Sequence, residues 1–142
     1  MSPRQVAIGI AERYNTNNPF EIARERNIEI LYEPMKTTLG FYLRYRRFQN
    51  IILNDALSEQ MQRFVCAHEL AHSILHADLN VPKLTRYTLF SKDKFELQAN
   101  TFAVELLLPD ELLYLYPDCS IFQLAASFGV PQEFVSLKQI GR

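Results

Sequence analysis

Two stretches of the chain, residues 58–76 and 93–108, carry apolar side chains at intervals of three and four positions. This spacing places the apolar side chains on one face of a helix. Ser58 and Asp93 can cap the helix N-termini, and Pro109 ends the second stretch. Since neither stretch contains Gly or Pro, the sequence predicts two continuous amphipathic helices.

Shorter helices are predicted around these two. Asn18 is placed to cap a helix that opens with Pro19, and Asn27 is expected to end it in the left-handed conformation. Residues 77–90 show little periodicity and are predicted to form a loop near the first long helix. The other short helices are expected at residues 3–13, 110–116, 121–128 and from Pro131 onward.

Three short apolar runs are predicted to be strands: Ile28–Tyr32, which alternates like a strand, Phe41–Tyr45 and Ile51–Asn54. Their connections are short, including a polar one over residues 46–50, and short connections favour antiparallel hairpins. We therefore predict an α+β fold in which a small three-stranded antiparallel sheet packs on a helical core, followed by C-terminal helices. A length of 142 residues suits a single domain spanning residues 1–142.

The first long helix contains the segment His68-Glu69-Leu70-Ala71-His72. Positions i and i+4 of a helix share a face, so His68 and His72 can present two imidazole nitrogens to one ion. Zinc accepts such nitrogens, and a catalytic zinc needs a third protein ligand and an open position for water. Glu69 is then the expected general base. The alternative interpretation is an amphipathic helix without a metal, whose histidines lie at the solvent-exposed edge of the apolar face. That interpretation does not explain why a glutamate lies between the two histidines.

Glu96 is the best candidate for the third ligand. It lies in the first turn of the second long helix, where Ala99, Asn100 and Ala103 share its face. Small side chains there allow two helices to approach closely, as a shared metal requires. The alternative role of Glu96 is a capping box with Asp93. The other candidate ligands are Asp78, Glu105 and His76.

Each of these other candidates has a geometric difficulty. His76 lies eight residues after His68, about 12 Å along a helix axis at 1.5 Å per residue. The three histidines therefore cannot all reach one ion from one straight helix, and His76 is expected beside the ligands. Asp78 could reach the metal only if the chain turned away from the helix near Leu75, where no glycine eases such a turn. Glu105 lies near the C-terminal end of the second long helix.

Composition narrows the classes of function. The chain has 15 Lys and Arg residues against 16 Asp and Glu residues, so the balance does not suggest non-specific nucleic-acid binding. No apolar run reaches the roughly 18 to 20 residues of a membrane span, and the N-terminus lacks a signal-peptide core. We expect a cytoplasmic protein without membrane contact, in which Cys66 and Cys119 are free thiols. Arg44, Arg46 and Arg47 are typical of a solvated hairpin, with a substrate-facing patch as the alternative.

The histidine motif resembles the ImmA/IrrE family of zinc metallopeptidases when it is taken together with a second motif. That motif is Glu96-x-x-Ala99-Asn100-x-Phe102-Ala103-x-Glu105-Leu106-Leu107-x-Pro109. Residues 18–23, 51–54 and 123–131 are also similar to this family. One departure is Gln98, where an acid is frequent in the family.

The resemblance implies a zincin-like helical core with one Zn²⁺ per chain. His68, His72 and Glu96 would hold the metal, and Glu69 would be the catalytic base. The resemblance also implies a partner helix-turn-helix repressor as substrate, whose cleavage derepresses a prophage or mobile element. Three further side chains are expected near the metal ligands, the last as a candidate second oxyanion donor: His76, Asn100 and Tyr87.

Alternatives remain for function and for the tail. A protein that sequesters the repressor without cutting it is the rival function, although an intact Glu69 argues against it. The tail from Leu124 resembles the first part of a helix-turn-helix, but residues 132–142 offer only two cations. A structural helix pair or a partner-docking surface on residues 120–142 is therefore expected instead of a DNA reader. The substrate is expected to bind as an added strand along residues 41–45.

Overall fold

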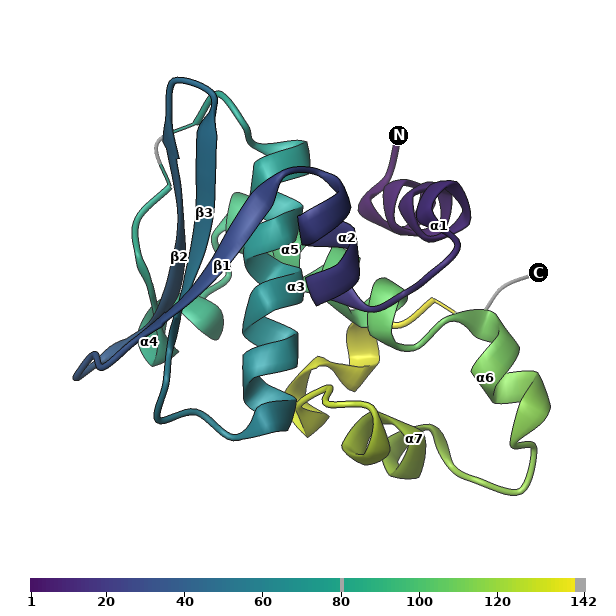
Figure 1. Cartoon of the computed structure of the whole chain (residues 1–142). Coiled ribbons are helices and arrows are strands. Elements are labelled where there is room, and N and C mark those ends of the chain that lie inside the picture. Colours follow the sequence, from purple (N-terminus) through teal and green to yellow (C-terminus); the bar gives the residue numbers. More distant parts are fainter. Residues whose placement is uncertain (80, 140–142) are drawn as a thin grey trace.

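The structure, a computed structural model, describes residues 1–79 and 81–139 and has an α+β fold (Figure 1). Its helices are α1 (Pro3–Tyr14), α2 (Pro19–Glu25), α3 (Glu59–Leu75), α4 (Arg86–Leu89), α5 (Lys94–Leu107), α6 (Asp110–Leu115), α7 (Ile121–Ser127) and the 3₁₀ helix η1 (Gln132–Leu137). Figure 1 shows the sheet on one side of α3 and the helices α1, α6 and α7 on the other side. Because α5 packs against both α3 and α1, the two long helices form the centre of the fold.

The sheet differs from the predicted three antiparallel strands. Its strands are β1 (Ile28–Glu33), β2 (Thr38–Tyr45), β3 (Phe48–Asn54) and β4 (Leu84–Thr85). They lie in the order β1-β3-β2-β4. β1 pairs parallel to β3, with Ile30 opposite Ile51, whereas β2 pairs antiparallel to both β3 and β4.

Burial explains the strand order. The last four residues of β3 are all buried, so this strand takes the position between β1 and β2. The connection from β1 to β2 is short enough for a hairpin, so the sequence predicted that these two strands pair. Connection length alone does not determine which strand lies in the centre of the sheet. Two local predictions are also corrected. The expected polar connection over residues 46–50 is a tight turn at Arg46 and Arg47, and the expected loop over residues 77–90 contains β4 and α4.

The predicted helix starts are confirmed. The Ser58 hydroxyl accepts the main-chain N–H of Met61 at 3.1 Å, and the Asn18 side chain accepts that of Phe20 at 2.9 Å. Asn27 has a left-handed φ of 62°, as expected after α2. These features are local, so the sequence predicts them well.

Gly40 brings β2 close to α3. A Cβ atom at this position would lie 2.8 Å from Cγ1 of Val65 and 2.9 Å from the carbonyl oxygen of Ile52. Both distances are shorter than a carbon atom tolerates, so only glycine fits without a shift. The close approach sets the following residues of β2 beside the histidine motif on α3.

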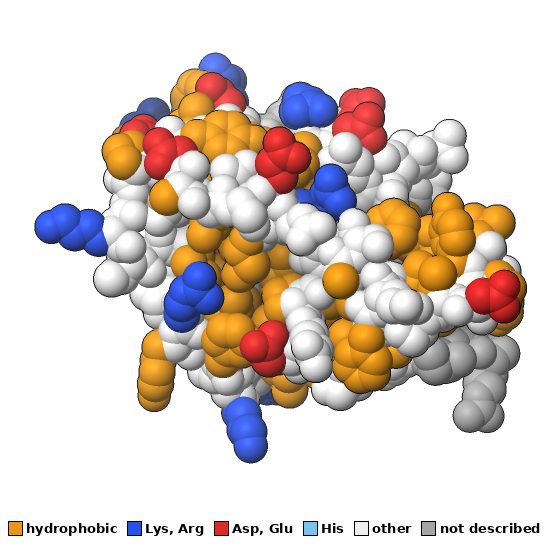
Figure 2. Space-filling view, turned by 90° about the horizontal axis from the view of Figure 1, so that it is seen from below, with side chains coloured by type: hydrophobic (Ala, Val, Ile, Leu, Met, Phe, Trp, Pro, Cys, Tyr) orange, Lys and Arg blue, Asp and Glu red, His pale blue; other side chains and the backbone are white. Residues whose placement is uncertain are grey.

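The C-terminal part exposes several large apolar side chains. None of the residues of α6 is fully buried. Hydrophobic side chains gather at the right of Figure 2, on the side of α6, with an acidic side chain beside them. The large exposed side chains of α6, α7 and their connection are Tyr114, Leu115, Tyr116 and Phe122.

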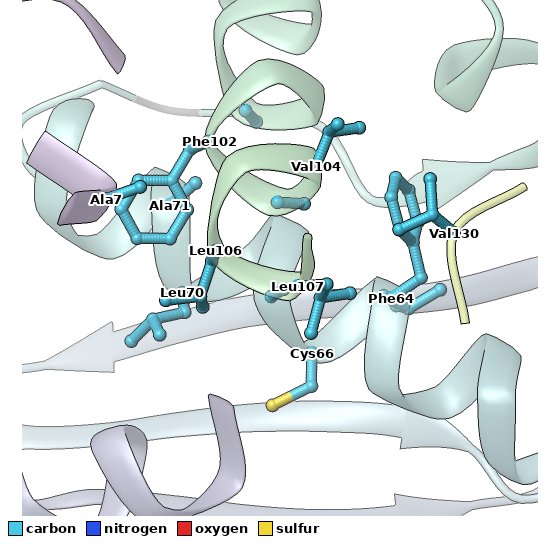
Figure 3. Close-up of a cluster of buried hydrophobic side chains, with 14 of the residues drawn as sticks. Ala7, Phe64, Cys66, Leu70, Ala71, Phe102, Val104, Leu106, Leu107 and Val130 are labelled. Carbon is cyan, nitrogen blue, oxygen red and sulfur yellow. The ribbon is translucent and has the colours of Figure 1, made fainter. Parts of the chain in front are cut away.

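The hydrophobic core surrounds α5. Figure 3 shows side chains of α1, α3 and the C-terminal segment packed around this helix, including Ala7, Leu70 and Val130. Phe64 of α3 and Phe102 of α5 are both fully buried. Burying such a side chain contributes about 1.5–3 kcal/mol relative to leaving it in water, so the core holds the two long helices in a fixed relation.

Both cysteines are free, Cys66 buried and Cys119 exposed, as the sequence predicts. Burial raises the pKa of the Cys66 thiol, so this side chain behaves as a small apolar residue. Across residues 1–79 and 81–139, none of the helices is long and apolar enough to cross a membrane.

A buried ion cluster joins the two ends of the described chain. The Lys138 ammonium lies 2.8 Å from Glu105 and 2.6 Å from Asp110, and its side chain is fully buried. Arg4 of α1 binds the same two carboxylates at 2.6 and 2.8 Å. Two cations and two anions balance one another, so the cluster ties α1 and the C-terminal segment to the end of α5.

Replacing Lys138 by Met is expected to destabilise the protein by about 3 kcal/mol. The substitution leaves the buried Glu105 without one of its charged partners, and breaking a buried pair costs about 3–5 kcal/mol. Arg4 still binds Glu105, which places the effect at the lower end. Urea unfolding followed by circular dichroism measures the change. The exposed Lys92, replaced by Met as a control, should change stability by no more than about 0.5 kcal/mol; similar losses in both variants would contradict the role of the cluster.

Candidate metal centre

Two helices bring the predicted ligands together. The middle of α3 supplies His68 and His72, one turn apart, and the first turn of α5 supplies Glu96. The alanines Ala71 and Ala99 on these helices are fully buried, which lets the helices approach closely. The ligands therefore stand on rigid elements packed against each other.

The three side chains converge on one point. Nε2 of His68 and Nε2 of His72 each lie 2.9 Å from Oε1 of Glu96, and 3.1 Å from each other. Among the described residues these three form the one group of histidine, cysteine and acidic side chains whose ligand atoms cluster within 4.8 Å. Two imidazole nitrogens and a carboxylate oxygen are a ligand set that zinc accepts, so the residues present fit a bound metal ion.

A second layer of hydrogen bonds fixes the ring of His68. The Asn100 amide N–H₂ donates to the carbonyl oxygen of Leu89 at 2.9 Å. The amide oxygen of Asn100 therefore faces His68 and accepts its Nδ1–H at 2.7 Å. This tautomer leaves the lone pair of Nε2 directed at Glu96, as a metal ligand requires.

A parallel chain of hydrogen bonds holds His72. The side-chain oxygen of Gln98 accepts Nε2–H of His76 at 2.7 Å. Nδ1 of His76 then accepts Nδ1–H of His72 at 2.9 Å, which leaves Nε2 of His72 free to bind a metal. Burial lowers the pKa of His76, which favours the neutral form that this chain needs. His76 thus supports a ligand and is not one itself.

The two glutamates at the site have opposite electrostatic environments. Burial raises the pKa of Glu69 to about 7, and the neighbouring Glu96 adds to this, whereas His72 and a main-chain hydrogen bond from Tyr42 oppose it. Burial would also raise the pKa of Glu96, but hydrogen bonds and charge from His68 and His72 outweigh it and lower the pKa to about 2. Glu96 is therefore an anion at neutral pH, and Glu69 is poised to exchange a proton.

A cleft gives access to this group. It has a volume of about 550 Å³ and is lined by Glu69, His72 and His76 together with residues of β2 and of the segment after α3. A second cavity, of about 430 Å³, is lined by Glu96 and by residues of the segment before α5. Leu79 and Val81 line both cavities, so the two cavities are neighbours.

The structure separates the competing candidates for the third ligand. Glu105 is engaged with Arg4 and Lys138 in the ion cluster. Asp78 lines the cleft but lies outside the ligand group. The capping box for Glu96 is wrong, because the Asp93 N–H donates to Ser91 and the Glu96 side chain faces the histidines.

The remaining expected residues fall around the group. Asn100 and His76 contact the two histidine ligands, as described above. Tyr87 lines the second cavity and is 87% exposed, and its role as an oxyanion donor stays a prediction. The sequence did not reveal the supporting role of Gln98, although its departure from the related motif marked the position.

Replacing Gln98 by Leu is expected to weaken zinc binding about 10- to 100-fold, the usual effect of losing a partner of a metal ligand. Leu cannot accept the Nε2–H of His76, so the ring of His72 loses its orientation. Gln98→Glu keeps an acceptor and should retain zinc affinity. Competition with a chromophoric chelator measures both affinities, and equal weakening in the two variants would contradict the role of the acceptor.

The ligand group is compatible with a metal site of the kind that metallopeptidases use. The chain belongs to the M78 peptidase family, because the family model described as the IrrE N-terminal-like domain matches residues 23–138. Metallopeptidase ImmA of Bacillus subtilis (strain 168) is 36% identical over 139 residues, which cover 93% of this chain and 82% of that protein. Uncharacterized immunity region protein 2 of Bacillus phage phi105 is 40% identical over 134 residues, covering 92% and 85%. The resemblance seen in the sequence is confirmed.

Proposed function

We propose that this chain is a cytoplasmic, zinc-dependent endopeptidase that cleaves a helix-turn-helix repressor and so derepresses a prophage or mobile element. The observation that carries the proposal is the convergence of His68, His72 and Glu96 beside the buried Glu69 in an open cleft. Family membership supports peptide-bond hydrolysis, and the names of the two relatives, a metallopeptidase and a phage immunity-region protein, support the biological setting.

The chemistry divides between the metal and the side chains. A zinc ion held by His68, His72 and Glu96 in a zincin-like arrangement would supply Lewis acidity for the scissile carbonyl and the attacking water. Glu69 takes the proton from that water and returns it to the leaving amine. Burial raises the pKa of Glu69, which favours its return to the protonated form after it takes the proton. Asn100 and His76 keep the imidazole rings oriented throughout.

The substrate binds along the free edge of β2. β4 pairs only with Thr38 and Gly40, so residues 41–45 have no strand partner on that side in the part of the chain that the structure describes. Tyr42 and Leu43 of this stretch line the cleft with Glu69. An extended peptide that adds to this edge would gain main-chain hydrogen bonds and pass the ligand group.

A second contact, between the repressor and the C-terminal helices of this chain, determines which protein is cleaved. Residues 106–137 contain no Lys or Arg, and three acidic residues of this segment are exposed: Glu111, Asp118 and Glu133. Exposed apolar side chains lie on the same segment, including Leu115 and Phe122. Figure 2 shows hydrophobic side chains gathered on the side of α6. An apolar surface with an acidic rim complements a basic, apolar protein surface such as that of a DNA-binding repressor. Phe122→Asp should therefore slow repressor cleavage and leave zinc content unchanged; unaltered cleavage would remove this surface from the account.

A reporter gene under the control of the repressor encoded beside this chain tests the function in cells. We expect that expressing the chain induces the reporter and that an immunoblot shows a shortened repressor. Induction with a full-length repressor would favour the rival function, in which the repressor is sequestered without being cut. No induction in the presence of stable protein would count against both functions.

A further inference from the structure

The two cavities beside the metal ligands have opposite chemistry. The cleft that holds Glu69 and His72 is also lined by Arg44 and Arg46 of the β2–β3 hairpin. The cavity that reaches Glu96 is lined mostly by apolar side chains. A peptide that passes the ligands and enters both cavities therefore meets cations in one and an apolar wall in the other. The apolar lining residues are Leu79, Val81, Pro82, Tyr87 and Phe95.

The arginines are available to a ligand. Within the described ranges neither Arg44 nor Arg46 forms an ion pair. Arg44 donates its Nε–H to the carbonyl oxygen of Arg46 at 3.2 Å, and the outer nitrogens of its guanidinium have no hydrogen-bond partner among residues 1–79 and 81–139. Asp78 lines the same cleft and makes no ion pair with either of them. The guanidinium fork binds a carboxylate with two parallel hydrogen bonds, so an acidic side chain is the matching ligand.

The hairpin turn separates these two arginines from the third. Arg46 has a left-handed φ of 57°, which makes the tight turn at the end of β2. Arg47 follows it but does not line the cleft, and its guanidinium lies 5.8 Å from the centre of the Phe48 ring. The arginine cluster therefore has two members that face the site and one that serves as a matched control.

We propose that the cleaved segment carries an acidic side chain that binds Arg44 and Arg46 and a large apolar side chain that fills the cavity beside Tyr87 and Phe95. The two side chains flank the scissile bond. This proposal rests on the proposed function for its assignment to a substrate, but the two subsites make a binding prediction that does not depend on cleavage.

Fluorescein-labelled decapeptides test the two subsites by fluorescence polarisation. One position of each peptide is Glu, Gln or Lys, and a second position, two to four residues away, is Leu or Gly. Each pair is made with the first residue before the second and with the order reversed, and the rest of the sequence is constant. The zinc-loaded Glu69→Gln variant is the binding protein, so that no peptide is cut. Peptides with Glu and Leu should bind about tenfold more tightly than those with Lys, and about tenfold more tightly than those with Gly in place of Leu.

Charge reversal in the protein supplies the second comparison. In the same background, Arg44→Glu and Arg46→Glu together should reverse the preference from Glu to Lys, whereas Arg47→Glu should leave it unchanged. Equal binding of Glu and Lys peptides, no measurable binding of any peptide, or an equal effect of Arg47→Glu would overturn the proposal. Selective binding of these peptides, together with a repressor that stays intact after incubation with the wild-type protein, would instead contradict the peptidase function and leave the subsites standing.

Discussion

Glu69→Gln is expected to lower the rate of peptide cleavage by at least about 10²–10⁴-fold, the usual contribution of a general acid–base group. Gln has the size of Glu but cannot take a proton from water or return it to the leaving amine. Glu69 does not belong to the ligand group, so zinc should stay bound. Repressor cleavage followed by gel densitometry measures the rate, and atomic emission measures the zinc content.

Two outcomes of this experiment separate the chemical role from other roles. The side chain of Glu69 is buried, so circular dichroism and thermal unfolding must show that the variant is folded. Full zinc occupancy with no cleavage supports the assignment. Cleavage at an undiminished rate by a folded, zinc-loaded variant would rule out Glu69 as the base. Another group would then have to accept the proton of the water.

Glu96→Ala is expected to cause the largest loss of metal. Glu96 is the one anionic side chain of the ligand group, and its removal leaves two neutral imidazoles. Zinc affinity should fall by more than the 10- to 100-fold that follows loss of an outer partner. Zinc content of the folded, desalted protein measures the effect directly.

Asp93→Ala is the matched control for Glu96→Ala. Asp93 caps α5 and accepts the main-chain N–H of Phe95 at 3.1 Å, but its side chain does not join the ligand group. Its loss should cost about 0.5–2 kcal/mol of stability and leave zinc bound. Normal zinc stoichiometry in Glu96→Ala would instead make Asp78 the third ligand, since Glu105 is already paired with Arg4 and Lys138.

The helices could be predicted because their signals are local. Caps such as Ser58 and Asn18 act within a few residues, and the apolar period of α3 reports the buried face of one element. The sheet could not be predicted in the same way. The parallel pairing of β1 with β3 depends on which strand is most buried, and the two residues of β4 carry no period at all.

The same distinction holds for the site. His68 and His72 could be paired from their spacing, because a helix places positions i and i+4 together. The hydrogen bond from His76 to Gln98 joins two helices, and its existence depends on how α3 and α5 are rotated against each other. No spacing in the sequence encodes that rotation. His76 and Asn100 could be expected near the ligands, but the role of Gln98 emerges only from the packed structure.

Mass spectrometry of the neighbouring repressor after incubation with this chain tests the central claim most directly. Purified repressor is mixed with the zinc-loaded protein and, separately, with the protein after chelation. The account predicts one defined cut that requires zinc and appears in no unrelated unfolded protein. An intact repressor after incubation with folded, zinc-loaded protein, or many cuts in unrelated proteins, would contradict it.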